Sequence, residues 1–170
     1  QTPAALAYLV DRGLSEATIK AARLGYWPRT DYRPGDRWGQ DKDVWLPRGW
    51  VIPCEYMGQL QYVKIRRPAE DMGPDEKNKY IAVKGSKKRG AVYNLADLAG
   101  KADGVLAEGE LNALILKQAL GDVCGVASVG DAGNMPGAQA LPVLARVKRL
   151  WLAYDPDKAG QDGAAKMAGL

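Results

Sequence analysis

Two short acidic segments, each at the end of an apolar run, constrain the fold of this chain most strongly. They are residues 105–114 and 150–160. Each begins with apolar residues over the length of a strand, reaches carboxylates abruptly, and continues with the spacing of a helix. A buried parallel strand followed by a helix presents its last residues at the carboxyl edge of a sheet, where open α/β folds bind ligands. The sequence therefore predicts an α/β fold with its functional groups at one sheet edge.

The carboxylates in these segments have the spacing of a divalent metal site. Asp155 and Asp157 are separated by one proline, so both side chains point to the same side of an extended segment. If Glu108 lies beside them on a neighbouring strand, three hard oxygen ligands converge. Mg²⁺ or Mn²⁺ favours such ligands, with substrate phosphates and water completing the coordination. We therefore expect the strands that precede Glu108 and Asp155 to be adjacent, with the intervening strand outside them.

The wording of the two segments resembles the TOPRIM domain. That domain is shared by bacterial primases, type IA and type II topoisomerases, some nucleases and recombination-mediator proteins. The resemblance implies that Glu108 is a general acid/base or metal ligand and that Asp155 and Asp157 are metal ligands. Segment 125–133 resembles the intervening strand and small-residue loop of the primase version.

One position departs from the primase pattern, which usually has an aspartate four residues after the glutamate. Here Asn112 stands in that place. An amide can ligate a metal through its carbonyl oxygen or donate a hydrogen bond to a phosphate, but it brings no charge. The departure leaves the metal affinity and the number of metal ions open.

The alternative to a functional site is that these carboxylates only cap the helices that follow them. Either motif alone is a weak signal. The two motifs in order, each after a strand and before a helix, favour the functional interpretation.

Composition excludes several chemistries. The chain has no histidine and only two cysteines, Cys54 and Cys124, so we expect no zinc site and no histidine base. Both cysteines lie in apolar stretches and are expected to be buried free thiols, which suits a reducing cytoplasm. No apolar run approaches membrane-spanning length and no signal-peptide pattern opens the chain, so we expect no membrane partner.

Charge divides the chain unevenly. Residues 1–100 carry 17 basic and 12 acidic side chains, whereas residues 101–170 carry 7 and 8. The net charges are therefore +5 and −1. A basic part beside an acidic, metal-binding part indicates a polyanionic partner. We predict two domains with these boundaries: a small mixed α+β N-terminal subdomain, then a TOPRIM-type, Rossmann-like parallel sheet flanked by helices.

Periodicity and turn residues predict the remaining elements. Residues 4–24 should form two short helices, the second capped by Ser15, and residues 27–50 a long loop with at most one strand edge. The other expected strands are 51–54, 60–67, 79–84, 91–94, 104–108, 123–128 and 149–154. The other expected helices are 95–99, 110–120, 138–146 and one that starts near residue 159.

Residues 8–26 and 50–95 resemble the opening of the catalytic core of bacterial primases. In that family, basic residues at matching places contact single-stranded template or nucleotide phosphates. The resemblance gives that role to Arg66 or Arg67, to Lys79, and to one of Lys84, Lys87 and Lys88. The alternative is a solvated hairpin, in which strand 60–67 exposes a polar face with Lys64 and Arg67.

Together these features resemble the catalytic core of a DnaG-like DNA primase from a bacterium, phage or mobile element. The implied activity is template-directed synthesis of RNA primers from nucleoside triphosphates on single-stranded DNA, with a replicative helicase as partner. A TOPRIM nuclease, a topoisomerase fragment and a non-catalytic nucleic-acid-binding TOPRIM protein remain alternatives. The chain begins without methionine and stops inside an expected helix. We therefore expect a fragment that binds metal and DNA weakly and makes few primers.

Overall fold

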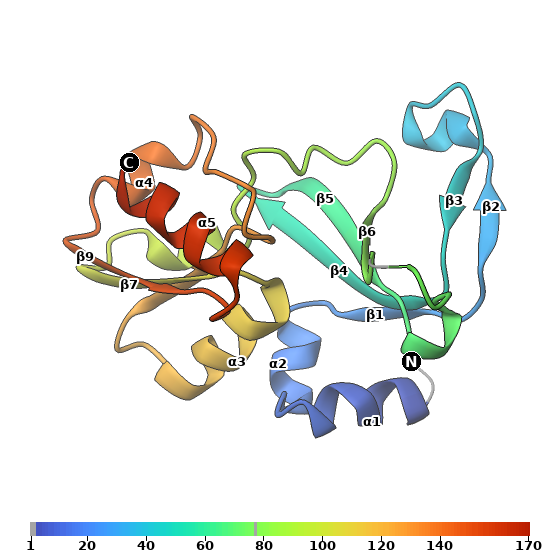
Figure 1. The fold of residues 1–170 in the computed structure, drawn as a ribbon, viewed down its shortest axis with the longest axis horizontal. Coiled ribbons are helices and arrows are strands. Elements are labelled where there is room, and N and C mark those ends of the chain that lie inside the picture. The colour runs from blue at the N-terminus through green and yellow to red at the C-terminus, as the bar shows by residue number, and fades with distance from the viewer. Residues whose placement is uncertain (1–2, 77) are drawn as a thin grey trace. The chain divides into compact units, whose positions relative to one another are not determined.

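Two compact units make up the chain, and each is described separately. The computed structural model describes residues 3–76 and 78–170. The first unit comprises residues 1–53 and 60–88, and the second comprises residues 54–59 and 89–170. Figure 1 shows the course of the chain through both. Their assignment to the two parts of a primase core stays a prediction.

The second unit contains a sheet of three parallel strands in the expected order. These are β7 (Asp103–Ala107), β8 (Gly125–Ser128) and β9 (Arg149–Ala153). Strand β7 is central and pairs in parallel with both neighbours, which gives the order β8-β7-β9. The predicted adjacency of the first and third strands is confirmed. Because β7 and β8 are buried along most of their length, both read as continuous apolar runs rather than alternating ones.

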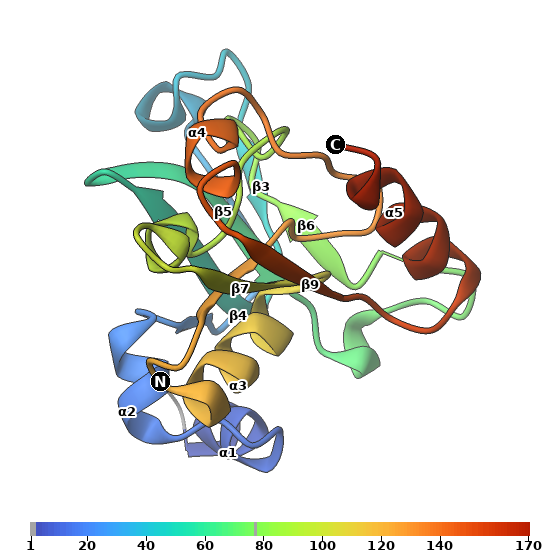
Figure 2. The same cartoon turned by 90° about the vertical axis from the view of Figure 1, so that its left-hand side faces the viewer.

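Helices cover both faces of this sheet. Helix α3 (Glu110–Leu120) lies on one face, and α4 (Leu141–Leu144) and α5 (Lys158–Ala168) lie on the other (Figures 1 and 2). This placement follows from right-handed crossovers in opposite directions along the sheet, from β7 to β8 through α3 and from β8 to β9 through α4. Helix α4 is shorter than the expected 138–146. It carries Pro142 in its first turn, where a missing N–H is tolerated, and residues 137–140 form a turn instead.

A short 3₁₀ helix, η3 (Leu95–Leu98), fastens the start of the second unit to β8. The Asp97 carboxylate accepts a hydrogen bond from the backbone N–H of Val126 at 2.8 Å. A Cβ on Gly125 would lie 2.5 Å from the Asp97 carbonyl oxygen, so only glycine allows this approach. Core side chains under the sheet come from η3, β7 and β8 and include Leu98, Leu106 and Ala127.

Asn134 anchors the loop that follows β8. It is 9% exposed, and its amide nitrogen donates to the carbonyl oxygens of Ala91 at 3.1 Å and Val129 at 2.7 Å. Its side-chain oxygen accepts from the N–H of Gly90 at 3.0 Å. The loop is therefore held by one buried side chain that satisfies three backbone groups.

The first unit begins with two helices, α1 (Pro3–Asp11) and α2 (Glu16–Ala21). The predicted cap is confirmed, since the Ser15 hydroxyl accepts from the N–H of Thr18 at 3.1 Å. A four-stranded sheet follows in the order β1-β4-β5-β6. Its strands are β1 (Gly25–Trp27), β4 (Gly49–Tyr56), β5 (Gln59–Arg66) and β6 (Tyr80–Ala82), with the 3₁₀ helix η2 (Ala69–Asp71) between the last two.

The prediction of a long loop over residues 27–50 is wrong. Strands β2 (Asp31–Arg33) and β3 (Val44–Leu46) pair antiparallel, and the 3₁₀ helix η1 (Gly35–Trp38) lies in the connection between them. Each strand is three residues long, too short for an alternating pattern to show in the sequence. The expected strand at 91–94 is also reduced, to a single antiparallel bridge between Tyr93 and Ser128.

Two expectations from composition can be compared with this structure. Cys54 and Cys124 are both buried free thiols, as predicted. Within the described ranges, no helix is long and apolar enough to cross a bilayer.

Arg48 connects the start of β4 to η2 within the first unit. Its guanidinium donates to both carboxylate oxygens of Asp71, at 2.8 and 2.6 Å, and to Glu70 at 3.0 Å. This fork-shaped contact holds the pKa of Asp71 below its ordinary value. A lowered carboxyl pKa stabilises the fold above the unfolded-state pKa, and that stabilisation is lost as the pH falls through the folded-state pKa.

We expect Asp71→Asn to lower the melting temperature at pH 7 by about 2–4 °C, as loss of one modest ion pair does in a domain of this size. The difference from wild type should shrink as the pH falls from about 4, where the carboxyl protonates in the unfolded state, through its lower pKa in the folded state. Thermal unfolding from pH 3 to 7 measures this effect. Asp75→Asn is the matched control, because Asp75 is exposed. A difference that does not change with pH would contradict the ion-pair account.

Asn134→Ala should destabilise the protein by about 2–4 kcal/mol, because three buried backbone groups lose their partner at once. Chemical denaturation measures the free energy of unfolding, and exposed Asn78→Ala serves as the control. A loss below about 1 kcal/mol would mean that water replaces the amide and that the loop is not anchored by it.

Candidate active site

Glu108 is fixed where three strands of the second unit end. It directly follows β7, and its backbone N–H donates to the carbonyl oxygen of Ala153 at the end of β9, at 3.3 Å. Its carbonyl oxygen accepts from the hydroxyl of Ser128 at the end of β8, at 3.0 Å. The backbone of Glu108 is therefore positioned by both neighbouring strands, and its half-buried side chain emerges at the carboxyl edge of the sheet.

The segment after β9 brings its own backbone against this carboxylate. Glu108 Oε2 accepts a hydrogen bond from the N–H of Asp155 at 3.2 Å. A Cβ on Gly160 would lie 2.1 Å from the Asp155 carbonyl oxygen and 3.0 Å from Glu108 Oε2. Only glycine therefore allows α5 to start this close to Glu108.

Asp157 caps α5, and Asp155 does not. Asp157 is the N-cap residue, and its Oδ1 accepts from the N–H of Gly160 at 2.8 Å. The alternative interpretation, that these carboxylates only cap helices, thus holds for one oxygen of Asp157. Its second oxygen takes no part in the cap. The side chain of Asp155 is exposed. All three predicted carboxylates therefore retain an oxygen that could bind a cation.

Negative charge is concentrated at this edge. Burial raises the pKa of Glu108, and the charges of Asp155, Asp157 and Asp131 raise it further, against the hydrogen bond from Asp155. Burial, followed by the charges of Glu108 and Asp131, raises the pKa of Tyr154 to about 12. The Tyr154 hydroxyl is buried and has no hydrogen-bond partner among the described residues.

Asp131 is an acidic residue that the sequence analysis placed only in a small-residue loop. It lies in the loop anchored by Asn134, and its Oδ1 accepts from the N–H of Gly133 at 3.0 Å. The signal that could have found it is its position, because it follows β8 as Glu108 follows β7 and Asp155 follows β9. Carboxyl ends of parallel strands meet at one edge.

These residues fit a divalent cation by their chemistry and location. They supply hard oxygens at one sheet edge, and their mutual repulsion, seen in the raised pKa of Glu108, is what a bound cation would relieve. In the part of the chain that the structure describes, no three acidic or cysteine side chains lie close enough to hold one ion together. The assignment of Glu108, Asp155 and Asp157 as metal ligands therefore stays a prediction.

Asn112 lies in the first turn of α3 and is half-buried. That turn directly follows Glu108 and Gly109, the N-cap residue. A metal-ligating role for Asn112 stays a prediction as well.

The six predicted basic residues all lie in the first unit, but their surroundings differ. Arg67 is only 7% exposed, forms an ion pair with Glu76, and donates to the carbonyl oxygen of Asp71 at 2.6 Å. The guanidinium carbon of Arg66 lies 4.7 Å from the ring centroid of Tyr8 and 5.6 Å from that of Trp50. The other four are three exposed lysines and one half-buried lysine, namely Lys79, Lys84, Lys87 and Lys88.

The expected polar face of strand 60–67 is wrong in one respect. Lys64 is 2% exposed, and its ammonium group lies 5.4 Å from the ring centroid of Tyr80. Lys64 in β5 and Arg67 directly after it are therefore both covered. The Tyr80 ring of β6 lies over Lys64, and Glu76 pairs with Arg67. Of the six predicted basic residues, Lys79, Lys84 and Lys87 are the exposed ones.

Comparison with known proteins identifies solved structures of the same fold. The primase of Aquifex aeolicus, solved with its zinc-binding and RNA polymerase domains, has a TM-score of 0.70 and 19% identity over 98% of this chain and 46% of that chain. A DnaG catalytic core has a TM-score of 0.71 and 18% identity over 97% of this chain and 59% of that chain. This chain thus spans about half the length of these relatives. No family profile and no curated sequence matches it. Its fold is that of DnaG primase catalytic cores.

Proposed function

We propose that this chain is a metal-dependent, template-directed polymerase core that makes RNA primers from nucleoside triphosphates on single-stranded DNA. One observation carries the proposal. Within a primase-core fold, Glu108 follows the central strand and the N–H of Asp155, after the adjacent strand, donates to its carboxylate. Carboxylates at the carboxyl ends of adjacent parallel strands are placed for phosphate chemistry with a divalent metal.

Asp155 and Asp157 would hold the metal, with Asn112 as a neutral further donor, and Glu108 would either bind the metal too or take the proton from the attacking hydroxyl. Mg²⁺ or Mn²⁺ bound there supplies positive charge that neutralises and orients the triphosphate. The second oxygen of Asp157 is suited to this role, because capping of α5 fixes the side chain through its first oxygen.

Glu108 is the best of these carboxylates for proton transfer. The 3′-hydroxyl oxygen of one ribonucleotide attacks the α-phosphorus of the next, the bond to pyrophosphate breaks, and the hydroxyl proton passes to a base. A base works best when its pKa approaches the working pH, and the pKa of Glu108 is raised in that direction. Its backbone contacts to Ala153 and Ser128 limit the positions that its carboxylate can take.

The exposed lysines of the first unit would bind the phosphates of the template or the incoming nucleotide. Lys79, Lys84 and Lys87 have the exposure that this role requires. Arg67 is a weaker candidate, because its charge is already used by Glu76 within the same unit. A replicative helicase is the further partner that we propose.

The second candidate is a non-catalytic TOPRIM protein that binds nucleic acid. The neutral Asn112 and the use of Asp157 as a helix cap favour it. A topoisomerase is disfavoured at this edge, because the hydroxyl of the neighbouring Tyr154 is buried and its pKa of about 12 opposes ionisation to a nucleophile.

Asn112→Asp should tighten Mg²⁺ binding by about fivefold or more, because a formal negative charge replaces a neutral amide beside the cation. Isothermal titration calorimetry measures the affinity. Gln118→Glu adds the same charge near the far end of α3 and is the matched control. If both variants change affinity equally, residue 112 faces away from the metal and the assumed helix register is wrong.

Incubation with labelled ribonucleotides, single-stranded template and Mn²⁺ should yield short template-dependent RNA in low amount. Asp155→Asn should reduce the product by about 100-fold or more while the circular dichroism spectrum stays unchanged. Nicked DNA would instead identify a nuclease, and relaxed supercoiled DNA a topoisomerase. DNA binding without any product, also in longer chains, would identify the non-catalytic alternative.

A further inference from the structure

The first unit contains a cavity in the segment that the sequence analysis assigned to a loop. Its volume is about 590 Å³, within the range of about 300–1,000 Å³ that small-molecule sites occupy. The floor is the apolar side of the β-structure, where Leu46, Ile65 and Val83 belong to one buried cluster. The walls and rim are different in character. They comprise two tryptophans, one proline and two arginines: Trp27, Trp38, Pro34, Arg33 and Arg37.

The wall that Trp27 of β1 forms presents polar groups to a ligand. The guanidinium carbon of Arg33 lies 5.2 Å from the ring centroid of Trp27, and its Nη2 pairs with Asp31 at 3.1 Å. Arg33 is therefore held beside the indole by an acidic neighbour. The indole N–H of Trp27 is buried and has no acceptor in the ranges that the structure describes. A buried donor without a partner is costly, so an acceptor on a ligand would be favourable here.

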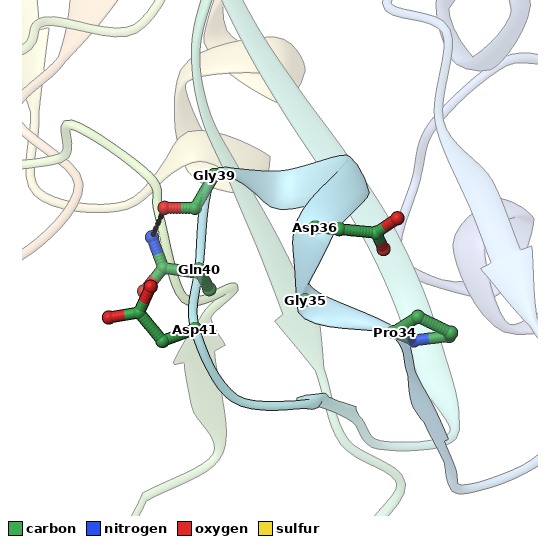
Figure 3. Close-up of a pocket in the computed structure, with 6 residues that line it drawn as sticks. All are labelled: Pro34, Gly35, Asp36, Gly39, Gln40 and Asp41. Atoms are coloured by element: carbon green, nitrogen blue, oxygen red, sulfur yellow. Dashed lines mark hydrogen bonds between the residues drawn. The ribbon is translucent and has the colours of Figure 1, made fainter.

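Helix η1 contributes Arg37 and Trp38 to the lining of the cavity. Figure 3 shows the turn of η1 at a second pocket, whose lining residues are Pro34, Gly35, Asp36, Gly39, Gln40 and Asp41. The N–H of Gln40 donates to the Gly35 carbonyl oxygen at 2.9 Å, and Gly39 has φ 61°, in the left-handed region. A Cβ on Gly35 would lie 2.2 Å from the Lys42 carbonyl oxygen. A Cβ on Gly85 would lie 3.0 Å from the Trp38 carbonyl oxygen. These contacts hold the turn, so Trp38 and Arg37 are presented on a pre-formed wall.

The lining specifies the chemistry of an occupant. Arg37 is exposed, and its guanidinium has no ion pair or hydrogen bond with any described residue. Trp38 is 37% exposed although it adjoins an apolar floor. A flat π-system suits the indoles, a ring acceptor suits the Trp27 N–H, and an anionic group suits Arg37. A purely apolar ligand would leave Arg37 unused, and an acidic peptide would leave the indoles unused.

We propose that this cavity binds one unpaired nucleotide of a single-stranded nucleic acid, with its base stacked on Trp38, a ring acceptor of the base on the Trp27 N–H, and its phosphate on Arg37. Stacking on aromatic side chains beside positive charge is the general chemistry of single-strand binding. The site uses none of the carboxylates at the sheet edge of the second unit. Binding in this cavity therefore requires no metal, and it can be tested independently of the polymerase function.

The test is the binding of a fluorescently labelled single-stranded oligodeoxyadenylate to the full chain, in a metal-free buffer with a chelator. Trp38→Ala should weaken binding by about fivefold or more, as removal of a stacked base contact does. Arg37→Ala should weaken binding and reduce the slope of log affinity against log salt by about one. Tyr32→Ala and Lys42→Ala are matched controls. Tyr32 is 67% exposed in the same segment, and neither residue lines the cavity.

Trp27→Phe keeps an aromatic ring but removes the indole N–H, so it should weaken binding, and Trp27→Ala should weaken it further. Circular dichroism checks that each variant is folded. Wild-type affinity in both Trp38→Ala and Arg37→Ala would overturn the proposal. Free deoxyadenylate that displaces the strand at an equal nucleotide concentration would also overturn it, because the site would then be one for free nucleotides.

Discussion

Parallel pairing of β7 with β9 is the interaction on which the candidate active site depends. The register places Ala107 opposite Ala153, and the hydrogen bond from the Glu108 N–H to Ala153 extends it by one step. A slip of one residue would turn Glu108 to the other face of the sheet. The glycine at position 160 then lets α5 begin against the Glu108 carboxylate. The pairing of β7 with β9 and the glycine at position 160 thus bring together groups that are far apart in the sequence.

This convergence has an electrostatic cost. Asp131, Asp155 and Asp157 all oppose ionisation of Glu108, which burial already disfavours. A carboxyl group whose pKa is raised by folding lowers the free energy of unfolding when it is ionised at neutral pH. Surrounding contacts compensate, chiefly the buried amide of Asn134 and the cap of α5 by Asp157. Raised carboxyl pKa values of this kind cluster at functional sites.

The elements around the acidic segments could be predicted from the sequence, and their surroundings could not. Buried parallel strands read as apolar runs that stop at a carboxylate, so β7, α3 and β9 were predictable within one or two residues. The strand order followed from requiring Glu108 beside Asp155. Strands β2 and β3 were missed because three residues carry no period. The burial of Lys64 was missed because tertiary contact with Tyr80, rather than strand alternation, determines it.

The proximity of Glu108 to the segment after β9 was predictable, whereas the role of these residues as a site stays a prediction. Glu108 and Asp155 lie together as the spacing predicted, because both follow adjacent strands. Capping by Asp157 depends on where α5 begins, which sequence spacing defines only to a residue or two. Strand β8 brings Asp131 to the sheet edge. The cavity in the first unit is formed in part by the η1 turn, whose sequence has no regular hydrophobic period.

Anomalous diffraction from a crystal soaked in Mn²⁺ tests the central claim most directly. The account predicts a strong anomalous peak at the carboxyl edge of β7 and β9, within about 2–2.5 Å of carboxylate oxygens from both Glu108 and Asp155. Mn²⁺ bound at other acidic residues, with no peak at this edge, would contradict it.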